Sequence, residues 1–425
     1  MEPPKKHFRK VHVFGLFACL ALFVTAQLAY DHPQATQAIV SAVENIGEQL
    51  AAVILSHNPR TIAQIKNDYV DTSTNQAKKV RILIVPGHNP DSGGAEFGSL
   101  KERNMTVELG QDLQKLLASN THYQVFIARD NTAWSPELTS YFQNNWSDIQ
   151  AWQNASYASF SHLVAIGAIT APVVTIDHLS TPPASATRLY GMTKWANEND
   201  IDIVLHIHFN DYAGRQGMNV GKYSGFAMYV PAEQYENSAT TKAVAATIFN
   251  RLKKYNPVSN LPAESSGIVD DPELIALGSY DTADAASMLI EYGYIYEAQF
   301  TNPALRSTAL NDLAFQTYLG LQDFFDPASS AKLATPYDTL VLPHTWNAPV
   351  TATNGSALDI FALQTALAYA GTYPPNDKTN NTCPRSGIFG TCTRVALQNF
   401  QTEQNITGEN GFAGPQTIAA LSALQ

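Results

Sequence analysis

The chain has 425 residues, of which 15% are charged, and it carries a formal net charge of -11 with a sequence pI near 5.4. This length exceeds that of one ordinary domain, so we expect two domains with connecting segments. The acidic balance argues against a nucleic-acid partner, because there is no surplus of basic side chains to neutralise phosphates.

The amino terminus has the pattern of a targeting segment. Lysine and arginine side chains up to Lys10 precede the mostly apolar stretch from Val11 to Tyr30, which is long enough to cross a membrane as a helix. Basic residues before such a segment keep that end in the cytoplasm and direct the rest outward. We therefore predict a signal or anchor helix over residues 1–33, with cleavage after Ala26 as the alternative to a retained membrane anchor.

A helical stalk and a linker are predicted over residues 34–79. From Gln34 to about Ile65, apolar residues recur at spacings of three and four, which is typical of an amphipathic helix. The stretch from Asp71 to Lys79 is polar and has no such period, which indicates a linker. The helix either serves as a stalk or packs against the next domain.

Residues 80–326 are predicted to form an α/β catalytic domain. Apolar β-branched runs such as Arg81 to Val85 and Ile203 to Leu205 indicate buried strands of a mostly parallel twisted sheet flanked by helices. The amphipathic stretch from Leu310 to Phe325 is expected to be the last helix of this domain.

Four side chains are suited to metal chemistry: His88, Glu102, His208 and Glu291. Three of their four segments follow or close apolar β-branched runs. Ligands of open α/β sheets gather at the carboxyl ends of strands, so one pocket could contain all four. Two imidazoles and one carboxylate are suitable ligands for a catalytic Zn²⁺, and they leave the fourth tetrahedral position to water. A second carboxylate, Glu291, is then available as the general base.

Six segments, taken in order, resemble the motifs of the zinc-dependent N-acetylmuramoyl-L-alanine amidases. They are Val85-Pro-Gly-His88, Leu100-Lys-Glu102-Arg-Asn104, Val125-Phe-Ile-Ala-Arg129-Asp130, Ala196-Asn197 followed by Asp202-Ile-Val-Leu-His-Ile-His208-Phe-Asn210, Gly225-Phe-Ala-Met-Tyr229, and Leu289-Ile-Glu291-Tyr-Gly293-Tyr294. The resemblance implies that His88, Glu102 and His208 hold Zn²⁺ and that Glu291 is catalytic. It also implies hydrolysis of the amide between N-acetylmuramic acid and L-alanine of the stem peptide.

Two positions depart from the family pattern. Asn89-Pro90 follows His88 where the family usually has two glycines, and His206 replaces a small residue two positions before His208. Because side chains alternate along a strand, His206 and His208 should point to the same face of the sheet. His206 is therefore expected to orient a ligand or to be structural, and competition for the metal is the alternative.

Two further residues are candidates for substrate binding. Arg129, at the end of a predicted strand, is expected to bind a substrate carboxylate through its bidentate fork, or else to form a structural ion pair. Asn210 is expected to hydrogen-bond substrate, with a turn-forming role as the alternative. The stretch from about Asn131 to Thr187 is long for the family, and we interpret it as an insertion that contacts glycan or peptide, or that only adds stability.

A linker is predicted over residues 327–354 and a small all-α domain of three helices over residues 355–425. The repeat is visible in the sequence, where Gly387-Ile-Phe-Gly390-Thr-Cys-Thr393-Arg-Val-Ala396-Leu397 recurs as Gly411-Phe-Ala-Gly414-Pro-Gln-Thr417-Ile-Ala-Ala420-Leu421. Each copy predicts a glycine turn that leads into a helix. The region resembles the three-helix peptidoglycan-binding domain, and a generic helical interaction domain is the alternative. A binding module joined to an enzyme raises the effective concentration of an insoluble substrate.

Cys383 and Cys392 lie close together in the turn region of this domain, so we predict a disulfide in an oxidising compartment, with two reduced thiols as the alternative. The whole chain is then expected to be a monomeric, zinc-dependent amidase of the cell envelope that acts on peptidoglycan outside the cytoplasmic membrane. Two other functions stay open at this point. One is a zinc peptidase that cuts within the stem peptide, and the other is a peptidoglycan-binding protein without activity.

Overall fold

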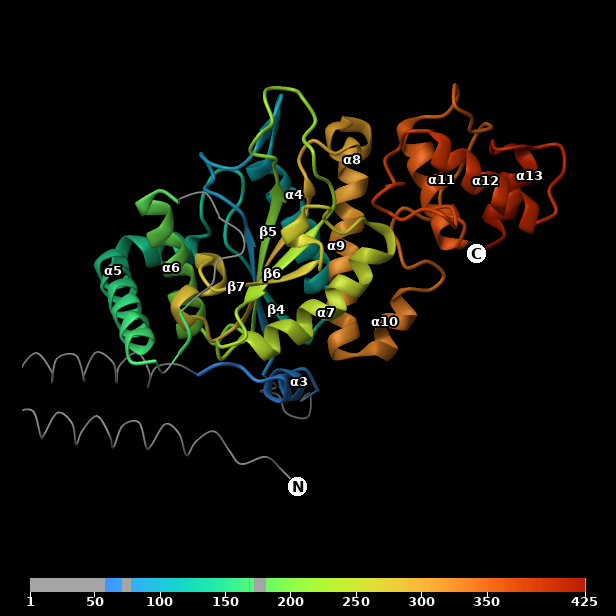
Figure 1. Cartoon of the computed structure of the whole chain (residues 1–425). Helices are drawn as coiled ribbons and strands as arrows, with labels where there is room; N and C mark the ends of the chain where they lie inside the picture. The colour runs from blue at the N-terminus through green and yellow to red at the C-terminus, as the bar shows by residue number, and fades with distance from the viewer. Residues whose placement is uncertain (1–57, 71–77, 168, 172–180, 425) are drawn as a thin grey trace, which may run out of the picture. The chain divides into compact units, whose positions relative to one another are not determined.

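The structure is a computed structural model that describes residues 58–70, 78–167, 169–171 and 181–424 (Figure 1). The chain divides into two compact units, one of residues 1–58 and 151–168 and the other of residues 59–150 and 169–425. The predicted signal or anchor helix lies outside the described residues, as does most of the predicted stalk. No helix within the described ranges is long and apolar enough to cross a membrane.

A six-stranded sheet forms the centre of the larger unit, with the strand order β4-β1-β5-β8-β6-β7. The strands are β1 (Val80–Pro86), β4 (Tyr123–Ile127), β5 (Ile203–Asn210), β6 (Ala227–Pro231), β7 (Ile268–Asp271) and β8 (Ala286–Tyr294), and a separate hairpin pairs β2 (Glu96–Phe97) with β3 (Leu100–Lys101). Strands β4, β1, β5 and β8 pair in parallel, and β6 pairs antiparallel with β8 and parallel with β7. The predicted mostly parallel sheet is confirmed.

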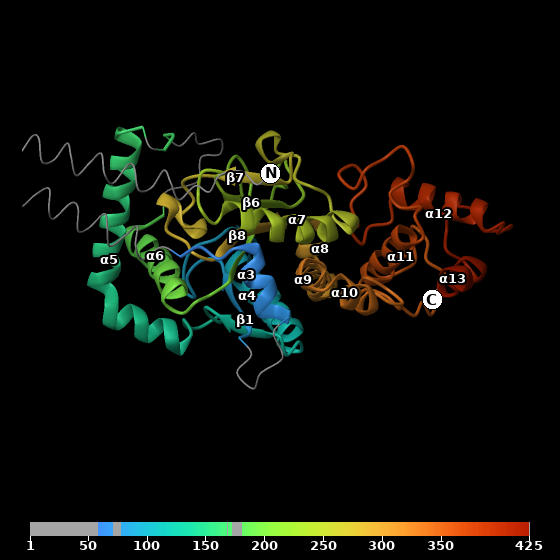
Figure 2. The same cartoon turned by 90° about the horizontal axis from the view of Figure 1, so that it is seen from below.

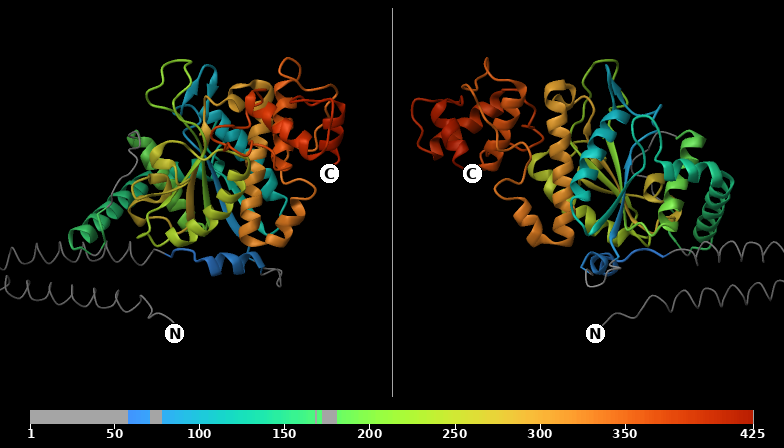
Figure 3. Two further views of the ribbon diagram at one scale, coloured as in Figure 1. Left: turned by 45° about the vertical axis from the view of Figure 1, so that its right-hand side comes forward. Right: turned by 180° about the vertical axis from the view of Figure 1, so that it is seen from behind.

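Helices cover both faces of this sheet, as two views from different directions show (Figure 3). They are α4 (Glu102–Ala118), α7 (Ser238–Tyr255) and α9 (Pro303–Phe325) on one face and α6 (Pro183–Glu198) on the other. The short helices η1 (Pro262–Glu264), η2 (Ile275–Leu277) and η3 (Ser279–Asp281) lie between strands, and α8 (Ala298–Thr301) lies between β8 and α9. Alternation along β5 explains the layers. Ile203, Leu205 and Ile207 are fully buried in the core that includes residues of α4, α7 and α9, whereas His206 faces Ala196 of α6.

The segment that precedes the sheet is attached near the amino ends of two central strands. Helix α3 (Ile62–Val70) packs against β1. The Nε atom of Arg60 lies 2.6 Å from Oδ1 of Asp202, which is buried just before β5. The other carboxylate oxygen of Asp202 accepts a hydrogen bond from the backbone N–H of Arg81. This charged cluster therefore lies at the opposite end of β5 from His208.

Helix α5 (Pro136–Ala165) forms most of the predicted insertion. Its backbone is non-helical at Asn145, where φ is -122° and ψ is 19°, so two helical segments meet there. In the smaller unit, the Ser156 hydroxyl donates to the carbonyl of Trp152 and so makes a contact within one turn. Contact between this insertion and glycan or peptide stays a prediction.

The carboxyl-terminal region contains the three predicted helices, α11 (Ala357–Tyr369), α12 (Thr391–Glu403) and α13 (Pro415–Ser422). In each copy of the repeat, a buried glutamine forms hydrogen bonds both to the glycine turn and to the helix that follows it. Gln364 accepts the N–H of Gly387 at 3.0 Å and donates to the Thr393 hydroxyl at 3.0 Å. In the second copy, Gln401 accepts from Gly411 at 2.9 Å and donates to Thr417 at 2.8 Å. Each glutamine thus fastens a glycine turn to the helix that follows it.

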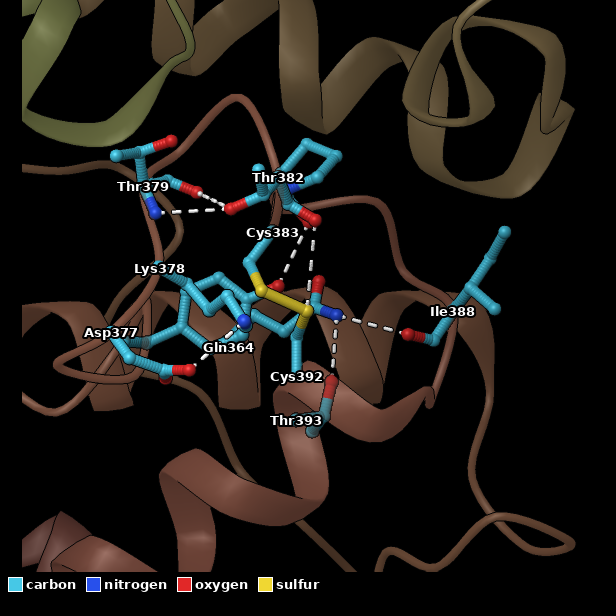
Figure 4. The surroundings of a disulfide bond; sticks show 11 residues. Gln364, Asp377, Lys378, Thr379, Thr382, Cys383, Ile388, Cys392 and Thr393 are labelled. Carbon is cyan, nitrogen blue, oxygen red and sulfur yellow. Dashed lines mark hydrogen bonds and ion pairs between the residues drawn. A yellow bond between two sulfur atoms is a disulfide. The ribbon is translucent and has the colours of Figure 1, made fainter.

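Cys383 and Cys392 form a disulfide, which confirms the predicted pairing (Figure 4). The bond joins the loop after α11 to the first turn of α12, and their Cα atoms are 5.7 Å apart. Thr379 and Thr382 form a turn just before Cys383 through reciprocal backbone and hydroxyl hydrogen bonds. The disulfide therefore anchors one end of the loop that carries Arg385.

The predicted irregular linker contains a helix, α10 (Pro327–Leu333), and is packed beyond it. Tyr337, Val341 and Leu342 are buried, and the backbone carbonyl of Asp338 accepts a hydrogen bond from Gln316 of α9. Because the segment is polar and rich in proline, its sequence did not indicate that these few apolar residues are buried. The segment beyond α10 therefore packs against α9.

Arg385 connects the carboxyl-terminal helices to the sheet domain, and α11 packs against α9 (Figure 2). The guanidinium of Arg385 lies 3.1 Å from the carboxylate of Asp312 on α9 and donates to the backbone carbonyl of Tyr255. The rings of Tyr255 and Phe361 lie 4.7 and 4.9 Å from the guanidinium carbon. Both members of the Arg385–Asp312 pair are at most 4% exposed, so this contact is fully desolvated.

Candidate active site

His88 lies in the turn that leaves the carboxyl end of β1. Its φ of 70° places a non-glycine residue in the left-handed region, a conformation that costs about 1–3 kcal/mol and persists only where the surroundings hold it. Arg129 provides such support. This side chain is 1% exposed, and it donates to the backbone carbonyls of Pro86 and Arg103 at 3.0 Å each.

Two glycines allow the histidines to come close together. A Cβ atom on Gly87 would lie 2.4 Å from the ring of His208, and one on Gly94 would lie 2.8 Å from the ring of His88. Gly94 also adopts a φ of 86°. Gly93-Gly94 therefore packs closely against the His88 side chain.

Glu102 begins α4 and lies between the two histidines. Its Oε2 atom is 2.9 Å from Nε2 of His88, and its Oε1 atom is 3.1 Å from Nδ1 of His208. The backbone N–H groups of Ala95 and Phe209 donate to the same carboxylate at 2.8 and 3.0 Å. Burial opposes the ionisation of Glu102, but the hydrogen bonds and charges of His208 and His88 outweigh it and hold its pKa well below the usual range.

These three residues could bind a metal ion. Their ligand atoms all lie within 4.8 Å of one another, and no second group of this kind is found in the described ranges. The Nε2 atom of His88 is buried and has no partner with hydrogen-bond geometry among the described residues. Burial lowers the pKa of His208, which favours the neutral imidazole that a metal requires. Two nitrogens and one oxygen are also the donor set that zinc accepts.

Glu291 lies beside this group on β8, where it is the register partner of His208. Its Oε2 atom is buried without a hydrogen-bond partner in the described part of the chain. Burial, followed by the charges of Glu102 and Glu264, raises the pKa of Glu291 well above its usual range. A carboxyl group in this environment holds a proton more readily than an ordinary glutamate does, which suits general acid–base chemistry.

Asn210 directs its amide toward a residue that the sequence did not identify. Its Nδ2 atom donates to Glu264 at 3.1 Å. Glu264 is 1% exposed and also accepts from the Tyr229 hydroxyl at 2.5 Å. Glu264 follows Leu261-Pro-Ala, a sequence without any recognisable signal for a site. Substrate binding by Asn210 and Arg129 stays a prediction, since both side chains are engaged within the protein.

His206 lies behind the three clustered residues. It is 4% exposed and lines a small cavity with Met192 and Ala196 of α6 and Ala276 of η2. Burial and the nearby charge of His208 lower its pKa to about 3. The structure groups His208, and not His206, with His88 and Glu102.

Comparison with known families identifies both parts of the chain. The model of the N-acetylmuramoyl-L-alanine amidase family matches residues 82–323. The chain belongs to this amidase family. In the same amidase, residues 356–421 match the model of a peptidoglycan binding domain. The chain is therefore an amidase that acts on peptidoglycan and carries a domain that binds it. Among curated protein sequences, none matches this amidase.

Solved amidase structures are similar to the chain at low sequence identity. The CwlD amidase of Clostridioides difficile, in complex with the GerS lipoprotein, has 15% identity and a TM-score of 0.37, and the match covers 58% of this chain and 98% of that one. Ami1 of Mycobacterium smegmatis has 13% identity and a TM-score of 0.38, and the match covers 58% of this chain and 97% of that one. AmiC2 of Nostoc punctiforme has 16% identity and a TM-score of 0.35, and the match covers 58% of this chain and 96% of that one.

Proposed function

We propose that this amidase uses Zn²⁺ bound by His88, Glu102 and His208 to hydrolyse the amide between N-acetylmuramic acid and L-alanine, in remodelling of the cell wall. The observation that carries the proposal is the cluster of three ligand atoms within 4.8 Å of one another. Glu291, the register partner of His208, supplies the second carboxylate that a hydrolase of this type needs.

When bound, zinc supplies a Lewis acid that polarises the substrate carbonyl and makes water more acidic. Glu102 and His208 hold fixed positions through the backbone and side-chain contacts around them. Glu291 takes the proton from the attacking water and then gives it to the departing nitrogen of L-alanine. Burial and the neighbouring acids raise the pKa of Glu291, so this carboxyl group retains the proton that it takes from water more readily than an ordinary glutamate would.

Asn210 and Arg129 have separate parts in this proposal. The Asn210 amide contacts substrate at the carboxyl end of β5 while Glu264 keeps it oriented. Arg129 holds the turn that carries His88, since its guanidinium donates to the carbonyl of Pro86 just before that turn and to the carbonyl of Arg103 on α4. Binding of a substrate carboxylate by Arg129 is the competing prediction, and the two differ in their effect on zinc affinity.

The proposed setting is the cell envelope outside the cytoplasmic membrane, with residues 1–33 as signal or anchor and residues 34–79 as stalk and linker. The disulfide between Cys383 and Cys392 supports an oxidising compartment. The catalytic domain would comprise residues 80–326 and the peptidoglycan-binding domain residues 355–425, joined by the packed segment over residues 327–354. We propose that the protein acts as a monomer.

Digestion of purified peptidoglycan with and without a chelator tests the reaction. We expect intact stem peptides with a free L-alanine amino group, and only when zinc is present. Mass spectrometry of the products distinguishes this outcome from that of a peptidase, which would release truncated stem peptides. Release of intact stem peptides at an undiminished rate by the chelated, zinc-free protein would contradict the proposed metal dependence.

A further inference from the structure

Glu264 is a buried carboxylate that accepts hydrogen bonds from four side chains. The amide of Asn210 donates to Oε1 at 3.1 Å and the hydroxyl of Tyr229 at 2.5 Å. The hydroxyl of Tyr294 donates to Oε2 at 3.4 Å, and the Ser259 hydroxyl donates to the same oxygen. With 1% of its surface exposed, this carboxylate depends on these donors, because an unpaired buried charge is very unfavourable.

A carboxylate in this position determines the direction of every contact. Asn210, Tyr229 and Tyr294 all donate to its two oxygens. The opposite side of the Asn210 amide is also engaged, since its Oδ1 atom accepts the backbone N–H of Asp211 at 2.8 Å. Glu264 therefore fixes the rotation of the Asn210 amide as well as its place.

The donors come from the strands that carry the catalytic group. Asn210 lies two residues beyond His208 on β5, and Tyr294 lies three residues beyond Glu291 on β8. Asn210 and Tyr294 are register partners, beyond the irregularity in the register that follows His208. Tyr229 belongs to β6, which pairs with β8 from the other side. One side chain thus joins the carboxyl ends of β5 and β8 to the middle of β6, beside the proposed active site.

We propose that Glu264 is a positioning residue of the amidase, which holds the carboxyl ends of β5 and β8 against the middle of β6 so that His208, Asn210 and Glu291 keep their relative places. This inference rests on the proposed function, because it assumes that those residues perform the chemistry. Glu264 acts through Asn210, Tyr229 and Tyr294 and does not touch substrate. Sequence patterns gave no indication of it.

The test compares full-length Glu264→Leu and Glu264→Gln with a control, Asp202→Asn. Asp202 is also a buried carboxylate, but it lies just before β5 and accepts from the Arg81 backbone, away from the site. For each zinc-loaded protein, kcat and KM on a soluble muropeptide, zinc content and the thermal midpoint are measured. We expect Glu264→Leu to lower kcat by about tenfold to a hundredfold with KM little changed, as is usual for residues that orient catalytic groups.

Glu264→Gln keeps the shape and can still accept from Asn210, so it should recover most but not all of the lost turnover. Asp202→Asn should lower the thermal midpoint without lowering kcat. The inference is overturned if Glu264→Leu lowers only the thermal midpoint while kcat equals that of the wild type. If Glu264→Leu does not fold, full wild-type kcat in folded Glu264→Gln overturns it instead.

Glu291→Gln, assayed on the same substrate, separates this inference from the proposed function. An inactive Glu291→Gln beside a fully active Glu264→Leu would refute only the positioning role. An active Glu291→Gln would refute the proposed role of Glu291, and with it the premise of this inference. A double variant, Glu264→Leu with Asn210→Ala, should lose no more turnover than the worse single variant if Glu264 acts through Asn210.

Discussion

His208 and Glu291 are register partners on the adjacent parallel strands β5 and β8. Paired residues of neighbouring strands point to the same face, so backbone hydrogen bonds hold the proposed metal ligand beside the proposed base. Both strands lie in the interior of the sheet, between β1 and β6. Their separation is therefore set by the most constrained part of the fold and not by a loop.

Glu291→Gln should abolish hydrolysis and leave zinc binding intact. The amide cannot take a proton from water, and loss of a general base typically lowers turnover by about a hundredfold to ten-thousandfold. Stem-peptide release measured by chromatography, together with metal analysis, checks this expectation. Glu403→Gln, an exposed position on α12, is the control that should keep full activity. Normal turnover by Glu291→Gln would exclude the assigned role.

Gly87→Ala should weaken zinc binding and lower activity. A Cβ atom at this position would lie 2.4 Å from the His208 ring, so the ring must move. A displacement of about 1 Å can cost about a hundredfold in turnover. Gly390→Ala is a matched control, because a Cβ atom there meets nothing within 4 Å. Equal zinc dissociation constants for the two variants, from chelator competition, would show that the close approach is unimportant.

Arg129→Lys separates two roles for that residue. Lysine keeps the charge but cannot donate to the carbonyls of both Pro86 and Arg103 from a planar fork. If Arg129 holds the turn that carries His88, the variant should bind zinc about tenfold to a hundredfold more weakly. If Arg129 binds a substrate carboxylate, KM should rise while zinc affinity stays the same. Zinc titration and steady-state kinetics on one preparation distinguish these results.

His206 should make the folded protein less stable in acid. Its pKa is about 3 in the folded protein, below the ordinary value of 6.5. Between these values the unfolded chain binds a proton that the folded chain does not, so the free energy of unfolding falls as pH decreases from 6.5. The slope from one such group approaches 1.4 kcal/mol per pH unit, roughly.

Urea unfolding of the wild type and His206→Asn at pH 7, 6 and 5 measures this slope. A chelator in every sample keeps the protonation of His88 and His208 comparable between the two proteins. We expect a shallower pH dependence for His206→Asn. Parallel curves for the two proteins would mean that His206 does not contribute, and that the neutral buried state has been assigned wrongly.

Arg385→Ala should destabilise the larger unit. The substitution leaves the Asp312 carboxylate buried without its partner, which typically costs about 3–5 kcal/mol. Arg394→Ala, an exposed position on α12, is the control and should have little effect. Calorimetry of both variants checks the difference. An unfolding midpoint for Arg385→Ala equal to that of the control would show that this contact does not hold the two parts together.

Residues at strand ends were predictable from the sequence because a parallel sheet collects them at one edge. The apolar runs before His88 and His208 indicated two of the strands, and the structure brings both histidines together with Glu102. Glu264 could not be found in this way. Its donors come from β5, β6, β8 and the loop before η1, and only the tertiary fold brings these segments together.

The packing of the carboxyl-terminal region was only partly predictable. The glycine repeat predicted the positions of α12 and α13, because a turn and the start of a helix depend mainly on residues that are close in the sequence. Arg385 was not identified, because an arginine in a polar loop usually lies in solvent and its partner Asp312 is far away in the sequence. The antiparallel direction of β6 could not be predicted either, because an apolar run indicates a strand but not its direction in the sheet.

The burial of Arg385 between Tyr255 and Phe361 has a consequence for how the enzyme samples a polymer. A fixed joint gives one spacing between the glycan held by the carboxyl-terminal helices and the bond that is cut, whereas a flexible tether would give many. Stem peptides at that spacing would be removed first from an intact sacculus. The early products should then show a periodic pattern along each glycan strand, which release of the joint would randomise.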